Sequence, residues 1–275
     1  MSKPMTFRPH FLSIALPAAL LAALAAPSPG TAADGLERAA QRGKLVAAVA
    51  YPLPEYRGGM KFRTPESLDS VLLADLSKRL GAPLATVRSS ASQVAPQLAA
   101  GKADLAVLAV GAAPAPGMTL VPTGYLAAPM AIMRTDTDIK RWEHLKGRKV
   151  CLSEGGLYAG TLAAKYGAIE IVQRAPADSL LAVRTGACDA AVHDSAMLEE
   201  LIRLPEWKKF SARLPAGPAV QLAFLLPAAD TAGAALLRKA AAQWKSSGFL
   251  EQSMKTAVRH IAFEVYLDQD VPDCH

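Results

Sequence analysis

Short apolar stretches alternate along most of this chain with segments whose apolar residues recur at helical spacing. In residues 65–80, five such positions fall on one face of a helix: Leu68, Val71, Leu72, Leu76 and Leu80. Stretches such as residues 84–88 and 149–153 have the length and composition of strands. Regular alternation of this kind predicts α/β layers built on mostly parallel sheets.

The alternation occurs as two similar series. The first predicts helices at 35–42, 65–80 and 93–100 and strands at 44–50, 84–88 and 103–110. The second predicts helices at 141–145, 157–166, 178–185 and 195–204 and strands at 149–153, 169–173 and 188–193. The extended segments 122–133 and 219–226 flank the second series, and two further helices are predicted at 232–246 and 249–260. We therefore predict two α/β lobes joined by two strands, with the C-terminal helices completing the first lobe.

The N-terminus has the order of a secretory signal peptide. Lys3 and Arg8 precede an apolar run at 11–26, which is followed by a Pro- and Gly-containing stretch and the small residues 31–33. The apolar run is shorter than the ~20 residues that span a bilayer. We expect cleavage after residue 33 and a mature chain in the periplasm; a retained N-terminal anchor helix is the alternative.

The organisation predicted along the chain has six parts. They are the signal peptide at 1–33, the first lobe at 34–124, a hinge strand at 125–133, the second lobe at 134–218, a second hinge strand at 219–226 and a return to the first lobe at 227–275. The roughly 240 residues after the signal peptide are enough for two such lobes.

Charge and motifs exclude several classes of function. The full chain has 30 Lys and Arg against 24 Asp and Glu, and loss of Lys3 and Arg8 lowers its net charge from +6 to +4. This small excess, spread without long basic runs, predicts no nucleic-acid partner. No zinc-type H-E-x-x-H, G-x-S-x-G elbow or phosphate loop occurs. We expect no metal, no cofactor and no catalytic residue.

Three cysteines would meet an oxidising periplasm. Cys151 and Cys188 lie in strand-like segments that we expect to be neighbours in one parallel sheet, so we predict a Cys151–Cys188 disulfide. Cys274 is left over near the C-terminus, where a free or mixed thiol is expected rather than a catalytic group.

An ordered set of short motifs resembles a known family. The motifs are Arg42-Gly43-Lys44-Leu45-Val46 (R-G-x-L-x-V), Tyr51-Pro52 with Pro54-Glu55 (Y-P-P-F-E), Gly101-Lys102 with Asp104 (G-K-x-D), Leu145-Lys146-Gly147 with Val150 (L-K-G-K-x-V), and Gly186 with Asp189-Ala190 and Asp194 (G-x-x-D-A-x-x-x-D). From about residue 35 to 254, the chain resembles the family 3 (polar amino acid) solute-binding proteins of ABC transporters. A branch of that family also carries cysteines at the two strands of Cys151 and Cys188.

The resemblance implies a type II periplasmic-binding-protein fold that binds a small molecule between its lobes without changing bonds. Hinge motion would close the cleft, and an ABC permease in the inner membrane would read the closed form. We expect the chain to act as a monomer.

The resemblance also suggests ligand-binding residues. Tyr51 matches an aromatic that stacks on the ligand, although a tyrosine packed in a turn is the alternative. Asp194 matches the aspartate that receives an α-ammonium, although it would equally cap the following helix. Gly155 and Gly156 would offer backbone donors at the start of a second-lobe helix.

The sequence departs from the family where an α-carboxylate would bind. Pro116 stands at the position of the family's carboxylate-gripping arginine, Gly111 replaces a serine, and Leu157 stands where a hydroxyl is usual. An ordinary free α-amino acid is therefore a doubtful ligand, and we expect a small solute that is amino-acid-like, cationic or partly apolar. Three other residues would line the cleft or else serve packing and the surface: Arg63, Tyr158 and His193.

Two other functions are compatible with the fold. Cyclohexadienyl dehydratases resemble these receptors, but they need an arginine and an acid/base carboxylate that the segment 113–116 lacks. An accessory or sensory partner of another periplasmic system, such as a quinoprotein dehydrogenase, would be consistent with the missing ligand groups.

Overall fold

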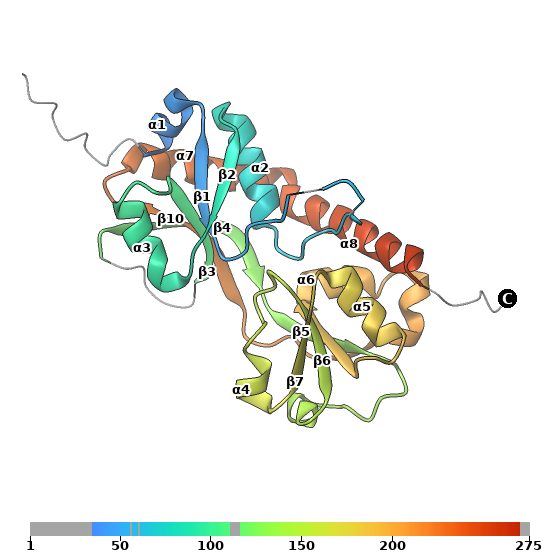
Figure 1. Ribbon diagram of the computed structural model, residues 1–275. Helices are drawn as coiled ribbons and strands as arrows, with labels where there is room; N and C mark the ends of the chain where they lie inside the picture. The colour runs from blue at the N-terminus through green and yellow to red at the C-terminus, as the bar shows by residue number, and fades with distance from the viewer. Residues whose placement is uncertain (1–34, 56, 60, 111–115, 270–275) are drawn as a thin grey trace, which may run out of the picture. The chain divides into compact units, whose positions relative to one another are not determined.

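The computed structural model describes residues 35–55, 57–59, 61–110 and 116–269, which form two five-stranded sheets with helices packed on them (Figure 1). The expected signal peptide at 1–33, Cys274 and most of the segment 111–116 lie outside these residues. Among the helices of the described part, none is long and apolar enough to cross a membrane.

The first sheet has the strand order β2-β1-β3-β10-β4. Its strands are β1 (Leu45–Val49), β2 (Leu84–Arg88), β3 (Leu105–Val110), β4 (Met118–Ala127) and β10 (Val220–Pro227). β1 runs parallel to β2 and β3, whereas β10 is antiparallel to both β3 and β4. The predicted parallel core is therefore present, with two antiparallel strands added at one side.

Helices cover both faces of the first sheet. They are α1 (Gly35–Arg42), α2 (Asp69–Leu80), α3 (Ala91–Ala99) and α7 (Thr231–Ser247). One core joins α1, α2 and α7 to the sheet through residues such as Leu36, Leu76 and Trp244. A smaller core places α3 on the other face, with Val94 and Leu98 against Ala106.

The second sheet has the order β7-β6-β8-β5-β9. Like the first sheet, it combines three parallel strands with two antiparallel strands at one side. Its strands are β5 (Pro129–Met133), β6 (Lys149–Ser153), β7 (Ile169–Gln173), β8 (Ala190–Asp194) and β9 (Ala212–Leu214). β6 is parallel to β7 and β8, and β5 is antiparallel to β8 and β9. Its helices are α4 (Leu162–Tyr166), α5 (Pro176–Arg184), α6 (Ser195–Leu201) and the 3-10 turns η2 (Trp142–Leu145) and η3 (Pro205–Phe210).

The chain passes between the sheets twice, at Ala128 between β4 and β5 and at 215–219 between β9 and β10. Both crossings fall in or beside the two segments predicted to be hinge strands. The lobe boundaries that we drew there stay a prediction.

The last helix, α8 (Phe249–Leu267), differs from the expectation that both C-terminal helices would pack on the first lobe. α7 packs against β4, β10 and α1, but α8 continues from it toward α5 and α6, which it contacts (Figure 1). Met254, Val258 and Ile261 share a core with Leu180 and Leu198 of the second lobe. Helical spacing alone identified α8 but did not reveal which sheet it covers.

One predicted helix begins later than its sequence pattern suggests. We expected a helix from residue 65, whereas α2 begins at Asp69. Thr64 and Glu66 bond to residues of the second lobe and its neighbouring helix, to Glu264 and Asp194 among others. These long-range contacts hold residues 64–68 outside the helix.

The predicted disulfide is confirmed. Cys151 of β6 and Cys188, just before β8, are joined with their Cα atoms 5.9 Å apart. The two strands are parallel neighbours, as expected, with Cys151 paired to Ala191. Both cysteines are buried.

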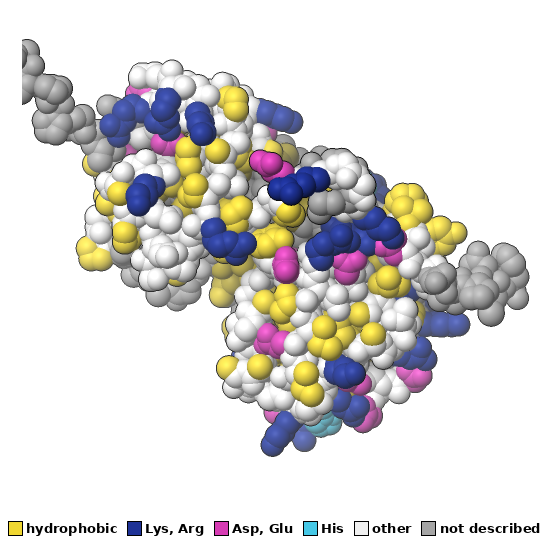
Figure 2. All heavy atoms as spheres, in the orientation of Figure 1, with side chains coloured by type: hydrophobic (Ala, Val, Ile, Leu, Met, Phe, Trp, Pro, Cys, Tyr) yellow, Lys and Arg dark blue, Asp and Glu magenta, His cyan; other side chains and the backbone are white. Residues whose placement is uncertain are grey.

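Charged side chains of both signs are scattered over the surface. On the face shown in Figure 2, Lys and Arg alternate with Asp, Glu and hydrophobic side chains and do not form one continuous basic area. This mixture of signs agrees with the small net charge of the chain.

Candidate functional site

The candidate site lies where strand ends of the second sheet meet loops of the first. Ser153 ends β6 and Asp194 ends β8, and these parallel strands are neighbours. Carboxyl ends of parallel strands are the usual ligand side of an α/β sheet, because polar side chains and free backbone groups gather there. Tyr125 comes from β4 of the first sheet and lines the same place.

Asp194 is both buried and a helix cap. Its Oδ1 accepts a 3.0 Å hydrogen bond from the backbone N–H of Ala196, and the residue is 5% exposed. Burial, which disfavours the charged carboxylate, raises the pKa of Asp194 to about 6. The capping role considered from the sequence is therefore present, and hydrogen-bonding neighbours at Tyr125 and Ala128 also act to lower the pKa of this carboxyl.

Two tyrosine hydroxyls are buried beside Asp194. Among the described residues, the Tyr158 hydroxyl has no hydrogen-bonding partner, whereas the Tyr125 hydroxyl lies close enough to the Asp194 carboxylate to interact with it but lacks good hydrogen-bond geometry. Burial and then the nearby Asp194 charge raise the pKa of both phenols, which stay neutral. Tyr125, Tyr158 and Asp194 line a cavity of about 10 Å³, enough for one water-sized group.

Glu66 lies at the centre of the site, although sequence reasoning did not select it. Its Oε2 accepts a hydrogen bond from Ser153 Oγ and is 2.8 Å from His193 Nδ1, and its Oε1 accepts a 3.0 Å bond from the backbone N–H of Asp194. Burial alone would raise the pKa of Glu66, but the His193 charge and these hydrogen bonds outweigh it and lower the pKa. Glu66 is therefore an ionised carboxylate, fully enclosed.

His193 is a buried partner of Glu66 and not a free cleft residue. It is 0% exposed, and its second ring nitrogen, Nε2, lies 2.8 Å from the Ser179 hydroxyl. Both ring nitrogens are thus engaged, and a ligand reaches neither while Glu66 stays in place.

Tyr51 lies near Glu66 but does not line the small cavity beside Asp194. Its hydroxyl donates a 2.9 Å hydrogen bond to Glu154 Oε2, and the Arg88 guanidinium lies 5.5 Å from its ring centre. Its ring faces the backbone of Gly155, where a Cβ would come within 2.6 Å of Tyr51 Cδ1. Burial, followed by the Glu154 contact, raises the pKa of this phenol.

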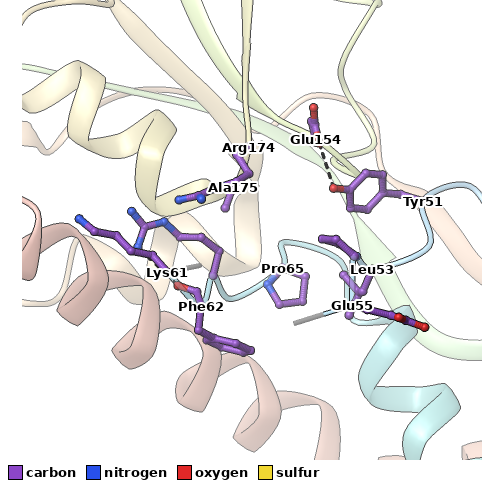
Figure 3. Close-up of a pocket in the computed structure, with 11 residues that line it drawn as sticks. Tyr51, Leu53, Glu55, Lys61, Phe62, Pro65, Glu154, Arg174 and Ala175 are labelled. Carbon is purple, nitrogen blue, oxygen red and sulfur yellow. Dashed lines mark hydrogen bonds between the residues drawn. The ribbon is translucent and has the colours of Figure 1, made fainter. Parts of the chain in front are cut away.

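A larger pocket opens beside Tyr51. It has a volume of about 120 Å³, with Tyr51 and Glu154 at one end and Lys61 and Arg174 at the other (Figure 3). Leu53, Phe62 and Pro65 supply apolar walls. Asp194 does not line this pocket, and Tyr51 does not line the small cavity beside Asp194.

The remaining sequence-selected residues have clear positions. Gly155 and Gly156 lie beside the small cavity, and Gly155 has a φ of +75°, which favours glycine. Arg63, which is 11% exposed, forms ion pairs with Asp178 and Asp268. Because both pairs occupy its guanidinium, Arg63 anchors its loop and does not offer a free positive charge to the cleft.

Sequence reasoning missed Glu66, Ser153, Tyr125 and Glu154. Tyr125 carried one usable signal, because it is an aromatic in a segment predicted to connect the lobes. Glu66 carried none, since an acidic residue after Pro65 is also typical of a first helical turn. Within the described residues, no group of three or more His, Cys, Asp or Glu side chains is placed to hold a metal ion.

Comparison with known proteins defines the class of fold. No family model and no curated protein matches the sequence. Among solved structures, a truncated, arginine-bound ArgBP from T. maritima is 18% identical, with a TM-score of 0.53 over 75% of this chain and 99% of that one. An arginine-bound amino acid ABC transporter substrate-binding protein from Streptococcus pneumoniae is 17% identical, with a TM-score of 0.57 over 82% of this chain and 98% of that one.

A third similar structure is an ancestral cationic amino acid solute-binding protein, which is 19% identical with a TM-score of 0.55 and covers 80% of this chain and 97% of that one. At these identities the likeness shows the fold alone. The chain has the two-lobe α/β fold of periplasmic solute-binding proteins, as the sequence motifs predicted.

Proposed function

We propose that this chain is the non-catalytic solute-binding component of an ABC-type importer. Residues 1–33 direct it to the periplasm, where it acts as a monomer and delivers its ligand to a permease in the inner membrane. The two-lobe fold supports this role, as do the similar structures whose titles name ABC transporters or solute binding.

The proposed ligand is a small solute with an ammonium or other cationic group and a partly apolar body. One observation carries this choice: the buried Asp194 carboxylate shares a small cavity with Tyr125 and Tyr158, and the Tyr158 hydroxyl has no partner among the described residues. An ammonium group donates several hydrogen bonds and would satisfy all three oxygens at once. It would also favour the ionised form of Asp194, which burial otherwise disfavours.

Entry of such a solute requires movement of the lobes. The cavity beside Asp194 has room for the cationic group only, so the rest of the solute must occupy space that opens between the sheets. The crossings at Ala128 and 215–219 are the places where backbone rotation would separate them. Tyr51 and the pocket beside it would then contact the apolar body.

A thermal-shift screen tests this function. Primary amines, polyamines, cationic amino acids and quaternary ammonium compounds are compared with neutral and anionic solutes of similar size. We expect a cationic compound to raise the melting temperature, since a ligand at 100 times its Kd adds about 2.7 kcal/mol of stability. If only anionic or neutral compounds do so, the cationic ligand is wrong.

An accessory or sensory role beside another periplasmic protein is the second candidate. It is favoured by Glu66, which fills the space next to Asp194 with a side chain of the protein itself. Neighbouring genes discriminate the two roles: permease and ATPase genes support import, and a dehydrogenase cluster supports the accessory role.

Catalysis, as in cyclohexadienyl dehydratases, is the least favoured reading. The two strongest acid/base candidates, Glu66 and His193, are buried against each other and against serine hydroxyls. His193 is also 0% exposed in the described part of the chain, so its ring is not accessible to a substrate there.

A further inference from the structure

The contacts of Glu66 define a receptor for a carboxylate on the second lobe. Three donors converge on its two oxygens: Ser153 Oγ and His193 Nδ1 on Oε2, and the backbone N–H of Asp194 on Oε1. The Glu66 side chain is 4% exposed and that of His193 is 0% exposed. Among the described residues, no Lys or Arg side chain pairs with this carboxylate.

The surroundings of these donors leave room for a carboxylate and little else. A Cβ on Gly156 would come within 2.7 Å of Glu66 Oε2, so a side chain at that position would clash with the bound group. Ser153 and His193 both lie on the second sheet, at or near the carboxyl ends of the adjacent strands β6 and β8. The donors therefore all belong to neighbouring strands of the second sheet, whereas Glu66 does not.

The carboxylate, in contrast, comes from the connection that follows strand β1 of the first sheet. Glu66 lies between β1 and α2, in residues 61–68, which we call the Glu66 segment. This segment is fastened just before Glu66: Arg63 pairs with Asp178 and Asp268, and Thr64 donates to Glu264 from both its backbone N–H and its hydroxyl. A group held in this way has a high effective concentration at its receptor, as a tethered ligand does.

We propose that Ser153 Oγ, His193 Nδ1 and the backbone N–H of Asp194 form a carboxylate-binding seat on the second lobe, of which the Glu66 side chain is the resident, tethered ligand. The seat accepts small monocarboxylates only when Glu66 is removed or withdrawn. While Glu66 occupies it, the chain links its two lobes without any solute. This inference concerns the group that fills the site and does not depend on the solute proposed above.

Replacement of Glu66 by alanine gives a direct test, because the atoms it deletes correspond to one molecule of acetate. We expect E66A to melt at a lower temperature than the wild type and to be stabilised by sodium acetate relative to sodium chloride at equal ionic strength. The expected rise in Tm is about 2–4 °C at an acetate concentration about five times its Kd. The wild type should show no such difference between the two salts.

Two controls give the result its meaning. E154A removes a nearby solvent-facing carboxylate, so it should gain no response to acetate, and E66A/S153A should lose most of the response of E66A. An equal effect of acetate on the wild type and E66A, or no effect on a folded E66A, overturns the proposal.

If E66A does not fold in chloride, two further measurements decide. Recovery of folded E66A in acetate supports the seat. If acetate recovers nothing, the Tm losses of E66Q, S153A and E66Q/S153A are compared: less-than-additive losses support a shared seat, and additive losses overturn it. A failed rescue leaves the cationic-solute proposal untouched, since that proposal is tested with Glu66 intact.

Discussion

The Tyr51 hydroxyl donates a 2.9 Å hydrogen bond to Glu154 Oε2, so that the loop after β1 contacts the turn after β6. The same tyrosine ring lies against Gly155, the residue after Glu154. A contact between the two lobes thus depends on an aromatic ring that meets a backbone without a side chain. Position 155 therefore favours glycine for two reasons: its φ is positive, and the Tyr51 ring lies against its backbone.

The two effects can be separated by comparing G155A with a Gly→Ala substitution at a matched glycine, Gly147. G147A replaces a glycine of similar φ (+70°) with nothing within 4 Å of the added carbon. We expect G147A to lose about 1–2 kcal/mol from its left-handed conformation and G155A to lose about 1–3 kcal/mol more from contact with Tyr51. Urea unfolding measures both losses, and equal losses would show that Tyr51 yields without cost.

Stability should fall as pH rises from about 4 to 6 because of Asp194. The pKa of its carboxyl is about 6 in the folded chain against an ordinary 3.8, so the folded state binds the proton more tightly than the unfolded state. Ionisation of this buried group reduces the unfolding free energy by about 3 kcal/mol in total, of which about 2 kcal/mol is lost between pH 4 and 6. Glu66, whose pKa is lowered, acts in the opposite direction and only below its ordinary value of 4.5.

D194N provides the control for that pH dependence. Asparagine is as good a helix cap as aspartate, so α6 should persist while the titrating group is lost. Urea unfolding from pH 4 to 7 should show a smaller decline with rising pH in D194N than in the wild type. Parallel pH profiles for the two proteins would mean that Asp194 is not the group responsible.

Loss of the Cys151–Cys188 disulfide should clearly lower the free energy of unfolding. It closes a loop across a sequence separation of 37 residues, which corresponds to about 3–4 kcal/mol in the chain-entropy model. We expect a reductant to lower the urea midpoint of the wild type strongly. The C151S/C188S variant should start from the lower midpoint and respond little to reductant; a large response would implicate another thiol.

Arg63 should hold the Glu66 segment in place. R63A removes the partner that Asp178 and Asp268 share but leaves Asp178 paired with Arg174 and Asp268 with Lys61. Because Arg63 is only 11% exposed, we expect a loss of about 1–2 kcal/mol. Hydrogen exchange should rise across residues 61–68. R134A, which breaks the exposed pair with Asp136, is the comparison and should change neither quantity measurably. Unchanged exchange in R63A would mean that other contacts hold the segment.

Local patterns predicted the fold well, because each segment had to bury one face. The period of Leu72 and Leu76 defined α2, and the apolar strands at 149–153 and 188–193 placed Cys151 and Cys188 on neighbours. The surfaces on which the helices pack were harder to predict from the sequence. The apolar face of α8 is consistent with either sheet, and only the tertiary structure shows that Val258 joins the core of the second lobe.

The site was predictable only in part. Asp194 and Tyr158 follow from their places at a strand end and near a turn, and both lie at the small cavity. Glu66 was not predictable, since its partners Ser153 and His193 are 87 and 127 residues away. A long-range carboxylate contact of this kind leaves no periodic signal in the sequence.

The most direct test of the proposed solute site is isothermal titration of the best cationic ligand from the thermal screen into the wild type, D194N and D136N at pH 7.5. D136N removes an exposed carboxylate from the surface and serves as the matched control. A charge-assisted hydrogen bond contributes about 1.5–3 kcal/mol, so D194N should bind about 10- to 100-fold more weakly while D136N binds as the wild type does. Equal affinity for all three proteins would contradict an ammonium site at Asp194.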